Sequence, residues 1–98
     1  MLIKIHKSYR NMVAVCDSDI IGNCFEEGKK ILDVRESFFK GDEIDEKELI
    51  EKMQDLQKED AAFNIIGKKA VACALKAGII SEEGILKVEN VPYALVLV

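Results

Sequence analysis

The sequence predicts a single α+β domain, with two central helices packed on a mostly antiparallel sheet. An N-terminal β-hairpin and further strands at the C-terminus form that sheet. Two observations predict it: strand-like apolar segments lie near both ends of the chain, and segments with apolar residues at helical spacing lie in the middle. With 98 residues, the chain is long enough for one core and too short for two, so we expect one domain over residues 1–98.

The first strands are predicted at residues 2–6, which alternate aliphatic and polar side chains, and at residues 12–16, which are almost continuously apolar. The segment between them includes Ser8 and Asn11, which favour turns, so the two strands should form a hairpin. Residues 31–34 follow a charged turn at Glu26, Glu27 and Gly28 and predict a third strand, whose partner the sequence does not define.

Two helices are predicted in the middle of the chain. Asp45 is a good N-cap and Glu48 stands three residues later, the spacing of a capping box. Apolar residues then recur at helical spacing, namely Leu49, Ile50, Met53 and Leu56. The second helix is expected over residues 68–77, because Gly78 stands where a left-handed C-cap is needed. Residues 85–88 and 93–98 predict the last strands.

The composition excludes several classes of protein. The chain has 14 Lys and Arg against 18 Asp and Glu, a net charge of −4, which disfavours RNA or an anionic membrane as a partner. We find no apolar run of the length that a signal peptide or membrane span requires, and we expect a cytoplasmic protein. Cys16, Cys24 and Cys73 are widely spaced and His6 is the only histidine, so we expect no disulfide, no metal site and no cofactor.

Acidic residues gather at Asp17, Asp19, Glu26 and Glu27. They have the chemistry to bind a divalent cation or to act as acid and base, but their spacing matches no calcium loop. We therefore expect a solvated acidic turn.

The most informative stretch runs over residues 63–70, where an apolar segment containing Asn64 ends at Gly67 and is followed by Lys68 and Lys69 at a helix start. In a functional interpretation, the helix N-terminus and the two lysines bind an anion or a partner at Asn64, Gly67, Lys68 and Lys69. In a structural interpretation, Asn64 ties a turn and Gly67 supplies backbone freedom. The sequence leaves both open.

The same stretch partly matches the Ile-Gly-x-x-Gly signature of KH domains, which clamps a nucleic-acid backbone between two helices. Ala70 replaces the second glycine, and its Cβ would hinder the close approach of that backbone. A KH-like RNA-binding protein is therefore an alternative with little support from this motif.

Blocks along the whole chain resemble a family of short archaeal proteins, domain of unknown function 424. They are Phe38-Phe39-Lys40-Gly41, Asn64-Ile65-Ile66-Gly67, Ala70-Val71 with Ala74, Gly78-Ile79-Ile80 and Val91-Pro92-Tyr93-Ala94. The resemblance implies an archaeal, cytoplasmic protein, and it suggests an association with the translation machinery. It implies no particular activity.

Three hypotheses follow. The first is a non-enzymatic binding module that meets a protein or ribonucleoprotein partner of the translation machinery. The second is a small enzyme or a small-ligand or anion-binding protein, with a site between the Asn64 turn and the Asp17 to Asp19 turn. It would use a carboxylate as base and the helix N-terminus at Gly67 to Lys69 to hold an anion. The third is a homo-oligomer with a mainly structural role, because the apolar segment 94–98 must be buried on both sides or covered by a partner.

Overall fold

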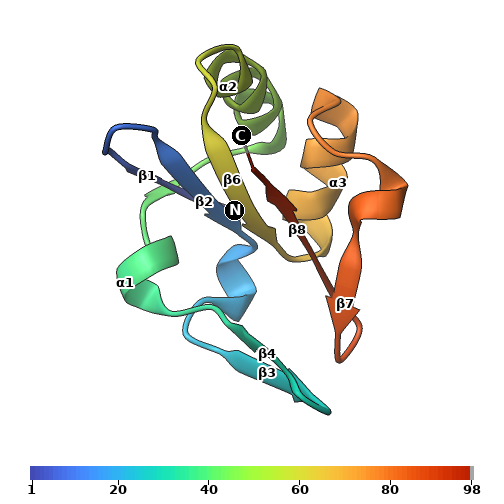
Figure 1. Cartoon of the computed structure of the whole chain (residues 1–98). Coiled ribbons are helices and arrows are strands. Elements are labelled where there is room, and N and C mark those ends of the chain that lie inside the picture. The colour runs from blue at the N-terminus through green and yellow to red at the C-terminus, as the bar shows by residue number, and fades with distance from the viewer. Residues whose placement is uncertain (98) are drawn as a thin grey trace.

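Six strands form one sheet in the order β5-β1-β2-β6-β8-β7 in the computed structural model, which describes residues 1–97 (Figure 1). All neighbouring strands in this sheet are antiparallel except β2 and β6, which are parallel. The strands are β1 (Leu2–His6), β2 (Met12–Cys16), β5 (Asp42–Glu43), β6 (Ala62–Ile66), β7 (Leu86–Val88) and β8 (Val91–Val96). The predicted α+β class and the N-terminal hairpin are confirmed.

The interpretation of Asn64 as a turn residue is wrong. Asn64 lies in the middle of β6, opposite Ala14 of β2 and Leu95 of β8. The residues of β6 other than Asn64 are apolar on both faces, so the sequence does not show the alternation that identifies a half-buried strand. Asn64 within the strand and Gly67 directly after it are residue types that favour turns, so the segment resembled a turn.

Both predicted helices are confirmed at their caps. Helix α2 (Glu46–Lys58) begins after Asp45, whose Oδ1 accepts a hydrogen bond of 2.8 Å from the Glu48 backbone N–H. Helix α3 (Lys68–Ala77) ends at Gly78, which has φ +77° and adopts the left-handed conformation expected of a C-cap. The two helices cover one face of the sheet.

The core on the helix side joins both helices to alternate residues of the central strands. It includes Val13 and Val15 of β2, Phe63 and Ile65 of β6, and Leu49 and Met53 of α2, together with small residues of α3 such as Ala70 and Ala74. The small side chains let α3 approach the sheet closely. All four residues from Val13 to Cys16 of β2 are fully buried, because Val13 and Val15 lie in this core and Ala14 and Cys16 lie in the cluster on the opposite face.

The other face of the sheet is covered over only part of its area. The cover consists of the short helix α1 (Glu36–Phe39) and a separate hairpin of β3 (Cys24–Glu27) and β4 (Lys30–Asp33). Their side chains form a second apolar cluster with the sheet, which includes Leu2, Cys16, Leu32, Val34, Phe39 and Ile66. The predicted third strand thus exists as β4, and its partner is β3.

The last strands lie close to their predicted positions. Strand β7 covers most of the predicted residues 85–88, and β8 begins two residues before the predicted 93. The end of that prediction, residue 98, lies outside the described residues. Over residues 1–97, no helix has both the length and the apolar character needed to cross a membrane.

Candidate functional site

The N-terminus of α3 is capped by a carboxylate from a distant part of the chain. Asp17, directly after β2, accepts hydrogen bonds from the backbone N–H of Lys69 at 3.1 Å and of Ala70 at 2.7 Å. Its exposed fraction is 7%, the one charged side chain in the buried class among the described residues. The expected solvated acidic turn is therefore wrong for Asp17, because the helix N-terminus satisfies its charge inside the fold.

Gly67 makes this cap possible. Its φ of +116° belongs to a region that L-amino acids rarely adopt, and a Cβ placed on it would lie 2.5 Å from Asp17 Cγ. The parallel pairing of β2 with β6 brings the two residues together, because their strands end side by side. Gly67 therefore allows the backbone turn from β6 into α3 and leaves room for the carboxylate.

This arrangement bears on the predicted anion site. The N–H groups of Lys69 and Ala70 already donate to Asp17, so an incoming anion would have to compete with a buried carboxylate. Both Lys68 and Lys69 are exposed at the start of α3. Their side chains remain accessible to a partner, whereas the helix N-terminus itself is occupied.

The second hypothesis placed its site between the Asn64 turn and the Asp17 to Asp19 turn, and the structure brings only Gly67 and Lys68 to the latter, without Asn64. A pocket of about 300 Å³ lies between the end of β2, the β3 strand and the start of α3. It is lined by Asp17, Asp19, Ile20, Asn23, Phe25, Gly67, Lys68 and Val91. Ile20, Phe25 and Val91 give the pocket an apolar side, and Asp19 and Lys68 bring charges of opposite sign to it.

Asn64 is separated from the other predicted site residues. It points to the face of the sheet opposite the helices, since its neighbours along the strand, Phe63 and Ile65, pack in the helix-side core. It lines a different hollow of about 390 Å³ with Asp33, Arg35, Ser37, Phe38 and Phe39. The four predicted residues therefore do not form one site.

The KH-like alternative is wrong in its geometry. Gly67 follows strand β6 and precedes α3, so the Ile66 to Lys69 segment does not join two helices. The clamp of that motif depends on a loop between two helices, as well as on the second glycine that Ala70 replaces.

Elsewhere the carboxylates gather without forming a metal site. Within the part of the chain that the structure describes, no group of three or more His, Cys, Asp or Glu side chains is placed to hold a metal ion. A hollow of about 370 Å³ beside β5 has carboxylates at Asp42, Glu43, Glu48, Glu51 and Asp55. At the β7–β8 turn, the Glu26 backbone N–H donates to the Glu89 carboxylate, and the Glu27 carboxylate accepts from the Glu89 backbone N–H, both at 2.7 Å.

Two of the three cysteines are buried, and the histidine makes contacts within the fold. Burial, and then the charge of Asp17, raises the pKa of the Cys16 thiol to about 11. Burial also raises the pKa of Cys73. His6 stacks on Phe38 with ring centroids 4.3 Å apart, and its Nε2–H donates to the Phe38 carbonyl oxygen at 2.8 Å. Cys24 is exposed and free.

An uncharged surface remains on the face of the sheet opposite the helices, beyond the area covered by α1 and the β3–β4 hairpin. We call it the open face. It carries large apolar side chains at high exposure, with Leu86 at 51%, Leu95 at 54% and Leu97 at 76%. Its residues are Met12, Asn64, Leu86, Tyr93, Leu95 and Leu97.

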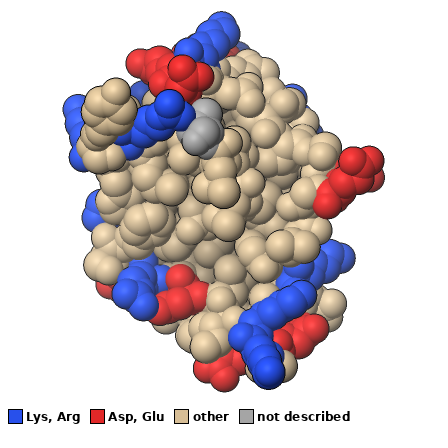
Figure 2. Space-filling view, in the orientation of Figure 1, with Lys and Arg blue, Asp and Glu red and all other residues tan. Residues whose placement is uncertain are grey.

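The strand register places these side chains next to one another. Leu95 lies opposite Asn64, and Tyr93 lies opposite Leu86, so each pair shares one face of the sheet. Figure 2 shows an area without Lys, Arg, Asp or Glu across the middle of the view, over β2, β6 and β8 in Figure 1, with charges around its margin. A contiguous exposed apolar patch with a polar rim is typical of an interaction site.

The sequence indicated one part of this surface. The apolar segment 94–98 predicted a strand that needs cover on both sides, and Ala94 is indeed buried whereas Leu95 is exposed. The contributions of Met12 and Leu86 were missed, because they join the face through strand pairing between distant segments.

The family model described as protein of unknown function (DUF424) matches residues 6–98. The chain belongs to this family. The predicted membership in domain of unknown function 424 is confirmed, and it assigns no activity. No curated protein matches the chain.

The DUF424 chain also has a structural neighbour, a crystal structure of an uncharacterized conserved protein from Methanopyrus kandleri. The two have 24% sequence identity and a TM-score of 0.86, over 96% of this chain and 87% of that chain. At this identity the likeness shows the fold alone. The organism of the neighbour is an archaeon, in keeping with the archaeal origin that the resemblance implied.

Proposed function

We propose that this DUF424 protein is a non-enzymatic binding module and that the open face is its docking surface for another protein. The observation that carries the proposal is the exposure of Leu86, Leu95 and Leu97, each by half or more, on a face without charged side chains at its middle. The cores of protein interfaces are depleted in charge in the same way. Covering these leucines removes apolar surface from water, which favours association.

The side chains with catalytic chemistry are engaged in contacts within the fold, which supports a binding function over an enzymatic one. The Asp17 carboxylate caps α3, and His6 donates to a backbone carbonyl. The Cys16 thiol is buried, and its raised pKa keeps it protonated at neutral pH. Each of these groups therefore has a structural role.

For the class of partner, the family resemblance suggests the translation machinery. Tagged protein would be incubated with native archaeal lysate, with and without nuclease, and the recovered proteins identified by mass spectrometry. Leu95→Lys would place a charge in the open face and should abolish specific recovery. Ile31→Lys is the matched control, because Ile31 is 66% exposed on β4 and outside the open face. Equal recovery by both variants would contradict the proposal.

A second candidate function is supported by the pocket between Asp19 and Lys68, where the Asp17 to Asp19 turn meets the start of α3. Its opposite charges and apolar walls suit a small molecule with both an ammonium and an anionic group. A thermal-shift screen of amino acids and related zwitterions tests it. A ligand of this site should raise the melting temperature of the wild type and leave that of Asp19→Asn and Lys68→Ala unchanged.

A further inference from the structure

A dimer interface of standard size would need most of one side of the molecule. A standard interface covers about 800 Å² on each partner. The described molecule exposes 6013 Å², so such an interface would take about 13% of its surface. One side of a body with extents of 36 × 28 × 26 Å is roughly a sixth of its surface, so the interface would extend from the open face onto α1 and the β3–β4 hairpin.

The charge distribution favours a second copy of the same chain. At a net charge of −4, two copies repel each other weakly, and an acidic or basic docking face would make this worse or demand an oppositely charged partner. The middle of the open face has no charged side chain, while both signs occur around it (Figure 2). In a two-fold interface the same surface of both copies is in contact, and two uncharged faces can meet without repulsion between like charges.

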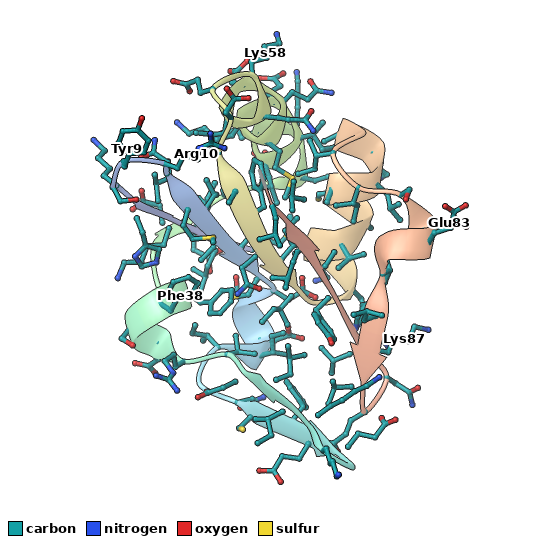
Figure 3. All side chains as sticks on the ribbon, viewed as in Figure 1. Tyr9, Arg10, Phe38, Lys58, Glu83 and Lys87 are labelled. Atoms are coloured by element: carbon teal, nitrogen blue, oxygen red, sulfur yellow. The ribbon has the colours of Figure 1, made fainter. Side chains whose placement is uncertain are left out.

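The shape of the face points the same way. Leu95 and Leu97 are exposed at the end of β8, and a hollow of about 390 Å³ lies at Asn64, the cross-strand neighbour of Leu95. The hollow is lined by Asp33, Arg35, Ser37, Phe38, Phe39 and Asn64, and Asp33 and Arg35 form an ion pair with each other. In a two-fold dimer, the projecting residues of each copy can enter the hollow of the other copy, so the same contact forms twice. Figure 3 shows Phe38 pointing from α1 toward the sheet, where its ring forms one side of this hollow.

We propose that the open face is the interface between two copies of this chain, in which Leu95 and Leu97 of each copy fill the hollow at Asn64 and Phe38 of the other. The side-chain amide of Asn64 both donates and accepts, so it can pair with a polar group at the rim of the other copy. This inference rests on the proposed function, and it takes the protein bound by the docking surface to be a second copy of the chain in place of a translation partner.

The test is light scattering on size-exclusion fractions of the purified chain over a concentration series from micromolar to millimolar. The proposal predicts twice the chain mass of 11.0 kDa for the wild type and for Ile31→Lys. Leu95→Lys should raise the dissociation constant roughly 30-fold or more, the effect expected for a central interface residue. Ser37→Trp, which fills the hollow without altering a leucine, should also weaken the dimer.

Circular dichroism melting curves check that each variant is folded. A monomeric wild type at every concentration would overturn the inference, and so would a dimer that neither Leu95→Lys nor Ser37→Trp weakens. A monomer that recovers another protein from lysate, and loses it on Leu95→Lys, would overturn the inference and leave the proposed function standing. If the wild type is monomeric and Leu95→Lys recovers the same proteins from lysate as the wild type, both the inference and the proposed function would be contradicted.

Discussion

The Asp17 carboxylate lies against Gly67, so close that a Cβ on the glycine would reach within 2.5 Å of Asp17 Cγ. The carboxylate also caps α3 through the Lys69 and Ala70 N–H groups. One contact therefore joins the end of β2, the end of β6 and the start of α3. It fixes how the helix layer meets the parallel pair at the centre of the sheet.

We predict that Gly67→Ala lowers the free energy of unfolding by about 3 kcal/mol or more, because it adds backbone strain to a clash with Asp17. Gly78→Ala is the matched control. Gly78 also has a positive φ, +77°, but a Cβ on it would meet nothing within 4 Å. The control should lose about 1 to 2 kcal/mol, the cost of the left-handed conformation. Urea denaturation measures both, and equal losses would contradict the role assigned to the contact.

A double-mutant cycle tests the contact itself. Asp17→Ala removes the helix cap and should cost about 2 kcal/mol. In that background, Gly67→Ala no longer meets the carboxylate, so its cost should fall by at least about 1 kcal/mol. Additive losses would show that Gly67 and Asp17 do not act on each other.

The cap at the other helix gives a smaller effect. Asp45→Ala should lower the free energy of unfolding by about 1 kcal/mol, because the Glu48 N–H at the start of α2 would lose its acceptor. Asp45→Asn keeps an acceptor oxygen and should lose only a few tenths of that. A loss below about 0.3 kcal/mol for the alanine variant would contradict the cap as a source of stability.

The thiols should differ sharply in reactivity. Cys24 is exposed, whereas Cys16 and Cys73 are buried and have raised pKa values. Ellman's reagent at pH 8 should therefore label one thiol in the native protein and three after unfolding in guanidinium chloride. The Cys24→Ser variant should have no rapidly labelled thiol. Rapid labelling of Cys16 would contradict its burial, because the thiolate is the reactive form and a thiol with a pKa of about 11 is almost entirely protonated at pH 8.

The helices and the first hairpin were predictable because their signals are local. Asp45 and Gly78 mark helix ends through hydrogen bonds within a few residues of the chain. Strand β6 was missed because apolar residues on both of its faces conceal the alternation of its burial, and because Asn64 is a residue type that favours turns. No local pattern could show that Asn64 and Leu95 lie side by side.

The predicted site residues are separated in the structure, because their positions depend on strand pairing between distant segments that no local pattern shows. Gly67 and Lys68 lie at a pocket with Asp17 and Asp19, but Asn64, which the second hypothesis placed at the same site, does not line it. Asn64, three residues before Gly67, points to the opposite face of the sheet and joins the open face. Capping of α3 by Asp17 depends on β2 and β6 ending side by side, which the sequence did not indicate.

The open face as a docking surface is the central claim, and site-specific photo-crosslinking tests it most directly. A photoreactive phenylalanine analogue would replace Leu95 in one variant and Ile31 in the control, and both would be irradiated in native archaeal lysate. The account predicts an abundant product from the Leu95 position at twice the chain mass of 11.0 kDa, and little from the Ile31 position. Equal yields of crosslinked protein from the two positions would contradict it.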